Sequence, residues 1–182
     1  MDILHYQQEF LNYLQSKKWI KDPKNLYEPI DYILHLGGKR MRPILTLMAA
    51  DIFSSNYKKA LPAALAVEVF HNFTLVHDDI MDDAPIRRGK VTVHEKWDIN
   101  TGILSGDAML IQGYQCLEIY EDPLYGKLNK QMSKTALEVC EGQQYDVDFE
   151  TENDVSIVAY LEMIKLKTAV LVGHALKVGA WI

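Results

Sequence analysis

The 182 residues are 48% apolar and 24% charged, with a formal net charge of −6, which is typical of one soluble globular domain over residues 1–182. The negative charge argues against nucleic acid or an anionic membrane as a partner, and no apolar run is long enough to span a membrane. Two cysteines are too few for a disulfide scaffold, and no signal peptide opens the chain, so we expect a cytoplasmic protein.

Apolar residues recur at helical spacing along nearly the whole chain, whereas the alternation typical of strands is almost absent. Proline, glycine and short polar runs separate the helical segments. In chain order, we expect helices at about 3–19, 26–36, 43–53, 57–83, 101–120, 123–144 and 154–182, with a short amphipathic piece near 91–97. These segments predict an all-α bundle whose helices share one interior.

Two segments, residues 102–113 and 170–182, indicate how the helices pack. Gly102, Gly106 and Gly113 share one segment at spacings that predict close contact with another helix. Residues 170–182 are apolar, patterned as a helix, and lack a polar stop signal. We therefore expect residues 1–182 to be the N-terminal part of a larger bundle.

Four aspartates stand within six positions at the end of a long apolar segment, just before Pro85. On a helix, Asp78 and Asp82 lie about 40° apart around the axis. Carboxylates about 6 Å apart repel each other by roughly 3 kcal/mol at an effective dielectric constant near 20, and the C-terminal dipole of the helix adds to this cost. A solvated acidic helix end is the alternative, but the apolar neighbours indicate burial. A Mg²⁺ ion, which prefers carboxylate oxygens, water and substrate phosphates, would relieve the repulsion.

Basic residues lie in two other places that suit an anion. Arg87 and Arg88 directly follow the aspartates, and guanidinium groups clamp diphosphates well. In the segment 37–43, three cations stand between a glycine pair and a helix start, where free backbone amides attract phosphate. The alternative for this second place is a solvated basic turn whose glycines only end a helix.

Three further side chains are candidates for the same site. His71 lies about 20° from Asp78 on the helical wheel and could donate to the anion, although a satisfied core histidine is the simpler interpretation. Lys165 and Lys167 interrupt an apolar helix, so one of them faces an anion or both extend to solvent. The apolar wall below the aspartates would suit a hydrocarbon tail. Residues 141–146 are explained as a helix end.

Four motifs, in this order, resemble those of the trans-isoprenyl diphosphate (polyprenyl) synthases. They are Gly38-Lys39-Arg40-Met41-Arg42-Pro43, Asp78-Asp79-Ile80-Met81-Asp82, Arg87-Arg88-Gly89 and Lys167-Thr168. The aspartate segment resembles the first aspartate-rich motif of that family. The resemblance covers essentially the whole chain and implies an all-α bundle around a deep central cavity, usually in a homodimer.

The resemblance also implies roles for single residues. Asp78 and Asp82 would bind the Mg²⁺ that holds an allylic diphosphate. The residues that would bind this diphosphate directly are Arg87, Lys167 and Thr168. The residues that would bind isopentenyl diphosphate are Lys39, Arg42, His71 and Arg88.

The implied reaction is head-to-tail chain elongation. Magnesium and basic residues stabilise charge as the allylic C–O bond breaks, and the double bond of isopentenyl diphosphate attacks the allylic cation before a proton is lost. Phe73 and Thr74 precede the first aspartate as in synthases of short products such as farnesyl or geranylgeranyl diphosphate. Nothing after Lys167 resembles the second aspartate-rich motif of the family, so we expect this chain to be inactive alone.

The sequence allows three other interpretations. Glu68-Val69-Phe70-His71 matches the Glu-x-x-His motif of di-iron bundles, but such sites need a second copy and two more glutamates. A terpene cyclase uses a similar aspartate helix but does not explain the basic segment 37–43. The chain could also be a non-catalytic partner subunit of a full-length synthase, which isolation with a larger catalytic chain would support.

Overall fold

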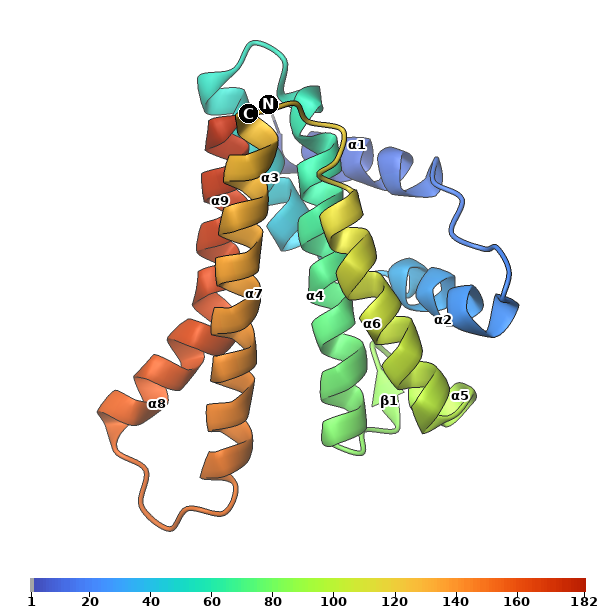
Figure 1. Ribbon diagram of the computed structural model, residues 1–182, viewed down its shortest axis with the longest axis vertical. Helices are drawn as coiled ribbons and strands as arrows, with labels where there is room; N and C mark the ends of the chain where they lie inside the picture. Colours follow the sequence, from blue (N-terminus) through green and yellow to red (C-terminus); the bar gives the residue numbers. More distant parts are fainter. Residues whose placement is uncertain (1) are drawn as a thin grey trace.

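The computed structural model describes residues 2–182, and nearly all of its regular structure is helical (Figure 1). The α-helices are α1 (Ile3–Gln15), α2 (Lys24–His35), α3 (Met41–Phe53), α4 (Leu61–Met81), α5 (Val93–Lys96), α6 (Ile99–Gln115), α7 (Leu124–Phe149), α8 (Ile157–Ile164) and α9 (Val170–Trp181). The prediction of an all-α fold is confirmed.

Three shorter elements complete the fold. The 3₁₀ helix η1 (Tyr57–Ala60) leads into α4, and the π-helical turn η2 (Lys165–Ala169) joins α8 to α9. Strands β1 (Ile86–Arg87) and β2 (Lys90–Val91) form a small antiparallel hairpin between α4 and α5. The sequence analysis did not predict this hairpin, because two residues per strand are too short to show alternation.

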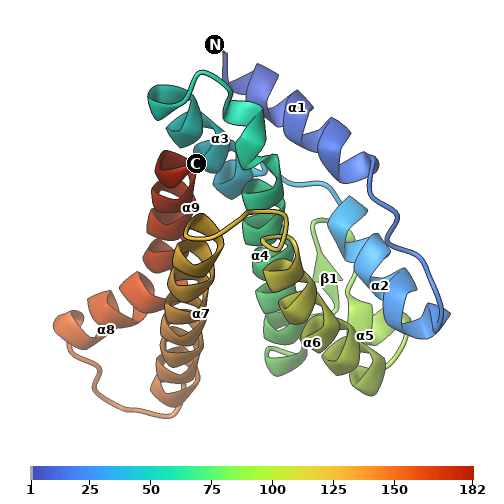
Figure 2. The same cartoon turned by 45° about the horizontal axis from the view of Figure 1, so that its top comes forward.

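Helix α4 lies between α6 on one side and α3 with α9 on the other (Figure 1 and Figure 2). Its residues from Ala63 to Phe70 are all buried, including the charged Glu68. A helix that is buried on every side belongs to the core of a bundle. Helix α7 runs beside α9 and packs closely against η2, so α4 and α7 can together present side chains to the space between them.

The small residues of α6 allow it to pack closely on α4. A Cβ atom on Gly106 would lie 2.2 Å from Nε2 of His77, and one on Gly102 would lie 2.9 Å from Cδ1 of Ile80. Gly113 lies against the backbone of Ala66. The close helix contact predicted for these three glycines is confirmed.

Several predicted helix boundaries need correction. The helix expected at 57–83 is divided, because η1 precedes α4 and Pro62 occupies the first turn of α4. Residues 141–146 lie inside α7 rather than at a helix end. The last helical stretch begins after Ser156, whose hydroxyl accepts the N–H of Ala159, and not after Asp154.

One apolar core connects the helices and holds α4 in place. Its fully buried large side chains include Phe10 of α1, Ile33 of α2, Leu47 of α3, Met109 of α6 and Met132 of α7. None of the helices in residues 2–182 combines the length and apolarity needed to cross a bilayer.

Candidate active site

The aspartates stand where α4 ends, and they differ in exposure. Asp78 is largely buried, Asp79 is 1% exposed, and Asp82 and Asp83 are exposed. Asp82 follows the last residue of α4, and its N–H donates to the carbonyl of Asp78 at 2.9 Å. Partial desolvation, followed by the neighbouring charge of Asp78, raises the pKa of Asp82. The charge of Asp78 thus acts on Asp82 in the direction that the sequence predicts.

Asp78 carries an oxygen without a hydrogen-bond partner. Its Oδ1 is buried and accepts no hydrogen bond from residues 2–182. The ammonium group of Lys167 lies 3.3 Å from this oxygen, and Nη2 of Arg87 lies 3.7 Å from Oδ2. Asp78 is therefore an ion-paired carboxylate that still has lone pairs free of hydrogen bonds, and a carboxylate of this kind can also accept a divalent cation.

Arg87 is held by the second aspartate of the motif. Its Nε lies 2.7 and 2.8 Å from the two oxygens of Asp79, and its Nη2 lies 2.7 Å from Oδ1. The hairpin brings Arg87 back onto the end of α4. Burial raises the pKa of Asp79, and the hydrogen bonds from Arg87 oppose this rise. No local pattern indicates a role for Asp79, because its partner Arg87 reaches it only after the chain reverses in the hairpin.

Lys167 reaches Asp78 from the π-helical turn η2. The same ammonium donates to Asp146 of α7, and it sits in the widened turn that π-helices often provide at functional sites. A Cβ atom on Gly142 would lie 2.1 Å from the backbone nitrogen of Lys167, so only glycine permits this approach of α7 to η2. Burial lowers the pKa of Lys167, but the hydrogen bond to Asp146 and the charge of Asp78 raise it overall.

Lys165 extends to solvent, unlike Lys167. Its ammonium is exposed and bonds the carboxylate of Glu162, in the preceding helix α8, at 2.7 and 2.9 Å. Of the two lysines in the turn, only Lys167 points at the aspartates.

The basic segment before α3 contacts Arg88 and Glu68. Gly37 and Gly38 have φ angles of 85° and 121°, which favour glycine. Arg88 donates to the carbonyl of Gly37, and its guanidinium occupies the space that a Cβ on Gly38 would need. Arg40 turns inward and forms a fully buried ion pair with Glu68, so it is structural rather than free to bind a ligand.

His71 and Arg42 form a second pair on the same side of α4. Nη1 of Arg42 lies 3.1 Å from Nε2 of His71, so the imidazole accepts from the guanidinium. Burial, and then the charges of Arg42, Arg88 and other arginines, lower the pKa of His71 to about 3. Burial also lowers the pKa of Arg42 and of Arg88. Such a cluster of desolvated cations would favour an anion.

Three adjoining hollows contain most of the predicted site residues. The basic hollow, of about 200 Å³, is lined by Lys39, Arg40, Met41, Arg42, Glu68, His71 and Arg88. The central hollow, of about 130 Å³, is lined by Arg42, His71, Thr74, Leu75, Asp78, Val139, Gln143, Lys167, Thr168 and Leu171. The apolar hollow, of about 180 Å³, is lined by Phe73, Thr74, His77, Asp78, Met81, Val139, Cys140, Gln143, Gln144 and Val147.

The shared lining residues show the order of the hollows. Arg42 and His71 line both the basic and the central hollow, and Asp78 lines both the central and the apolar hollow. Asp82 and Arg87 line none of the three hollows. Both interact electrostatically with Asp78, which lines the central hollow. Charge therefore changes along the row, from cations through mixed charge to an apolar wall.

Two α7 residues were missed by the sequence analysis. Gln143 lines two of the hollows, and Asp146 pairs with Lys167. The spacing of Gly142 and Asp146, one helical turn apart, was the available signal, but the segment was interpreted as a helix end.

The di-iron interpretation of Glu68 and His71 does not match the structure. Glu68 is 2% exposed, pairs with Arg40, and accepts the side-chain amide of Asn72 at 3.1 Å. His71 accepts from Arg42. Within residues 2–182, neither belongs to a group of three close metal-ligating side chains.

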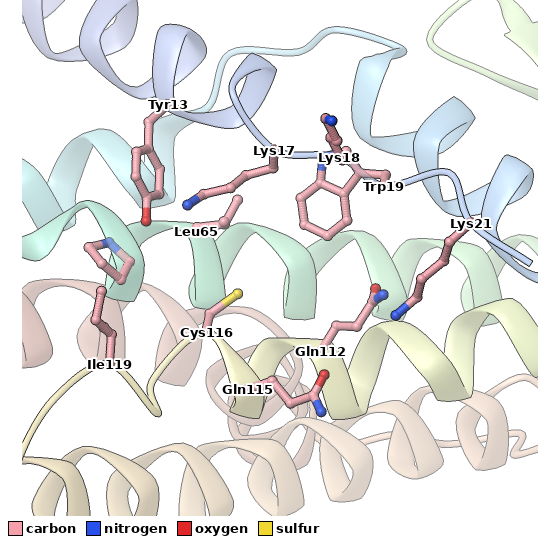
Figure 3. Close-up of a pocket in the computed structure, with 11 residues that line it drawn as sticks. Tyr13, Lys17, Lys18, Trp19, Lys21, Leu65, Gln112, Gln115, Cys116 and Ile119 are labelled. Atoms are coloured by element: carbon pink, nitrogen blue, oxygen red, sulfur yellow. The ribbon is translucent and has the colours of Figure 1, made fainter.

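A separate hollow of about 350 Å³ lies between the end of α1, α4 and α6 (Figure 3). Lysines from the segment after α1 surround it together with Trp19. None of the predicted site residues lines this hollow, so the site on α4 does not extend into it.

Comparison with known proteins gives consistent matches. The family model described as polyprenyl synthetase matches residues 23–182. The geranylgeranyl diphosphate synthase of Methanosarcina mazei is 46% identical over 160 residues, which cover 87% of this chain and 49% of that protein. The geranylgeranyl pyrophosphate synthase of Geoglobus acetivorans is 40% identical over 162 residues, covering 88% of this chain and 51% of that protein.

Solved structures match in fold. The crystal structure of a geranylgeranyl pyrophosphate synthase has a TM-score of 0.96 at 60% identity, with coverage of 99% of this chain and 55% of that one. A geranylgeranyl pyrophosphate synthetase from Pyrococcus horikoshii has a TM-score of 0.85 at 36% identity, with coverage of 97% and 57%. The chain spans about half the length of the relatives it matches.

Proposed function

The chain belongs to the polyprenyl synthetase family, and we propose that it binds an allylic diphosphate and isopentenyl diphosphate side by side for head-to-tail prenyl transfer. The matched relatives are named as geranylgeranyl diphosphate synthases, which supports a trans-prenyltransferase. The proposed allylic site is the central and apolar hollows, and the proposed isopentenyl diphosphate site is the basic hollow.

The order of the three hollows is the observation that carries this proposal. A diphosphate in the central hollow would meet Lys167 and Thr168, while its hydrocarbon tail would enter the apolar hollow past Phe73. A second diphosphate in the basic hollow would meet Lys39 and Arg42. Two anionic groups and one apolar tail thus have adjoining places of matching chemistry.

Magnesium fits the donor set at the end of α4. Oδ1 of Asp78 is buried and has only its ion pair with Lys167, and Asp82 adds a second carboxylate, whose pKa is raised by desolvation and then by the charge of Asp78. Carboxylate oxygens with room for water and phosphate suit Mg²⁺. Bound there, Mg²⁺ would neutralise the diphosphate as it leaves.

The remaining steps fall to side chains of the chain itself. Lys167 and Thr168 would bind the leaving diphosphate, and Arg87, fixed by Asp79, would add positive charge at the rim. Arg42 would hold the second diphosphate, with neutral His71 as its neighbour. The apolar hollow would keep water from the allylic cation while the double bond of isopentenyl diphosphate attacks it.

A short product suits the apolar hollow. Phe73 is buried and packs against Phe70 and His77, with ring centroids 5.5 and 4.8 Å apart. A tail that grows toward Phe73 would be stopped by this aromatic cluster. We therefore propose a short product, of farnesyl or geranylgeranyl length.

A homodimer is the proposed assembly, and the exposed side of α6 is a suitable surface for it. Apolar side chains gather there in the part of the chain that the structure describes: Ile99, Ile103, Leu104 and Ile111. An apolar helix face of this kind is typical of protein interfaces. Light scattering of the Ile103→Glu/Ile111→Glu variant should give a monomer if α6 forms the dimer contact.

A binding experiment tests the function directly. Calorimetric titration of the chain with geranyl diphosphate should give Mg²⁺-dependent binding that weakens by at least about tenfold, or 1.4 kcal/mol, in the Asp78→Asn/Asp82→Asn variant. The matched control Asp154→Asn, on an exposed carboxylate, should bind as the wild type does. An affinity for geranyl diphosphate that changes neither with Mg²⁺ nor with the double substitution would contradict the proposal.

A second titration separates this function from that of a non-catalytic partner subunit. Isopentenyl diphosphate should bind without displacing geranyl diphosphate. The Arg42→Met variant should no longer bind isopentenyl diphosphate. Such a subunit has no need of either site, so the absence of binding by both diphosphates would favour it. Turnover of labelled isopentenyl diphosphate with an allylic primer would show whether the chain is active alone.

A further inference from the structure

Three potential metal ligands meet beside the aspartate helix but outside the three hollows. They are Asp83, just after α4, and His94 and Glu95 in α5. One ligand atom from each lies within 4.8 Å of the other two, and in residues 2–182 this is the one group of three that does so. The proposed reaction uses none of these side chains.

His94 gives this group a feature that exposed acidic residues lack. Its side chain is 4% exposed, and neither ring nitrogen has a hydrogen-bond partner among residues 2–182. Nε2 points toward Glu95 and lies 3.9 Å from Oε1, which is too far for a hydrogen bond. A buried imidazole left in this state costs roughly 1–3 kcal/mol, so a missing partner is expected on its open side.

We propose that Asp83, His94 and Glu95 bind one divalent cation of the zinc type, at a site distinct from that of Asp78 and Asp82. One imidazole nitrogen and two carboxylate oxygens are ligands that Zn²⁺ accepts together, with a fourth position left for water. Mg²⁺ prefers oxygen ligands alone and would choose the other site. The two sites therefore differ in donor chemistry, although Asp82 and Asp83 are neighbours in the chain.

The position of the group gives such an ion a structural role. Asp83 follows α4, and His94 stands in α5, so the ion would join the two ends of the segment that contains the hairpin. Asp83 has a φ of 49°, in the left-handed region, where the chain turns away from the helix. A bound ion would fix the base of the hairpin, independently of whether a diphosphate binds.

Equilibrium dialysis of the metal-free chain against Zn²⁺, with millimolar Mg²⁺ present, tests the site. We expect one zinc ion per chain in the wild type, in Asp78→Asn/Asp82→Asn and in the matched control His35→Phe, which removes an exposed histidine. His94→Phe should weaken binding by more than the roughly 10–100-fold typical of changes to outer-shell partners. Co²⁺ in place of zinc should give visible absorption bands with the wild type. The same bands should be absent with His94→Phe.

A second variant covers the case in which His94→Phe does not fold. Asp83→Asn/Glu95→Gln changes exposed side chains, should keep the wild-type circular dichroism, and should lose zinc as strongly. Zinc binding that survives both variants, or that disappears only in Asp78→Asn/Asp82→Asn, would overturn the proposal, as would the absence of any stoichiometric binding.

Discussion

The ammonium group of Lys167 lies 3.3 Å from Oδ1 of Asp78, although α4 and the turn η2 that carry the two residues are far apart in the sequence. Lys167 also pairs with Asp146, so it lies between α4 and α7. The π-helical turn η2 and Gly142 bring it there. The first two predictions follow from this contact, because anything that moves Lys167 changes the charge around Asp78.

Replacement of Lys167 by Met should weaken Mg²⁺-dependent binding of geranyl diphosphate. A hydrogen bond to a charged group contributes about 1.5–3 kcal/mol, which corresponds to roughly 10–100-fold in affinity. Lys165→Met is the matched control, because Lys165 lies in the same turn but bonds only Glu162 on the surface. Isothermal titration calorimetry measures the affinity of both variants for geranyl diphosphate. Equal losses of affinity would mean that the effect is not specific to the contact with Asp78.

Gly142→Ala should destabilise the chain and disturb the site together. The new Cβ would lie 2.1 Å from the backbone nitrogen of Lys167, and backbone atoms cannot move aside as a flexible side chain can. Overpacking of this kind costs typically about 1–3 kcal/mol. Gly173→Ala is the control, since nothing lies within 4 Å of its Cβ position in α9 and alanine favours the helix by roughly 0.5–1 kcal/mol.

Urea denaturation and diphosphate titration check both glycine variants. Gly142→Ala should lower the free energy of unfolding and the affinity, whereas Gly173→Ala should raise the former and leave the latter unchanged. A stable Gly142→Ala variant with normal affinity would show that α7 and η2 do not pack as closely as described.

The fold was predictable from the sequence wherever the signal was local. Asp78 and Asp82 are one helical turn apart, so their common face followed from helix geometry alone. The apolar period likewise located α4 and α6, and the glycines of α6 indicated a close contact with another helix. The roles proposed for the site residues are predictions that the structure makes geometrically reasonable and that the titrations above test.

What the sequence did not reveal depends on contacts between distant segments. The contact of Arg87 with Asp79 arises only because a hairpin with two residues per strand reverses the chain. Asp146 meets Lys167 only because α7 continues past the segment interpreted as a helix end. The π-helical turn shifts the helical phase by a single residue, which is too small a change for periodicity to detect.

The buried ion pair of Arg40 and Glu68 gives a third prediction. Arg40→Met alone leaves Glu68 charged and 2% exposed, so we expect a loss of about 3–5 kcal/mol in unfolding free energy. Arg40→Met/Glu68→Met removes both charges and should be considerably more stable than the single variant. A double-mutant cycle from urea denaturation measures the difference, and additive losses would argue against direct coupling between the two residues.

His174 gives a prediction for the dependence of stability on pH. Burial, and then the charge of Lys177, lower the pKa of His174 to about 4, whereas the pKa of histidine in the unfolded chain is near its ordinary value of 6.5. The unfolded state therefore binds more protons between these values, and the free energy of unfolding falls as the pH decreases from about 6.5 to about 4. Each unit of pKa difference contributes roughly 1.4 kcal/mol at most.

His174→Phe should flatten this part of the stability profile, although it also removes the 3.3 Å contact between Nδ1 and the hydroxyl of Thr135. The test compares the slopes of wild type and variant in urea denaturation from pH 7 to pH 4, because a slope does not depend on a constant loss of packing. Parallel profiles would show that His174 does not titrate as expected. His71, with its pKa of about 3, adds to the slope in both proteins.

Phe73 gives the last prediction, which concerns the length of the bound hydrocarbon chain. Phe73→Ala removes the ring that lines the apolar hollow beside Asp78 and Val139. The variant should bind geranylgeranyl diphosphate better, relative to geranyl diphosphate, by roughly tenfold or more, because a few additional buried methylene groups contribute about 0.8 kcal/mol each. Phe70→Ala is the matched control: Phe70 packs against Phe73 in the core but does not line the hollow. Titration with the two diphosphates should show the change in preference for Phe73→Ala alone, and the same change in both variants would mean that general loosening of the core, rather than the Phe73 ring, controls the length.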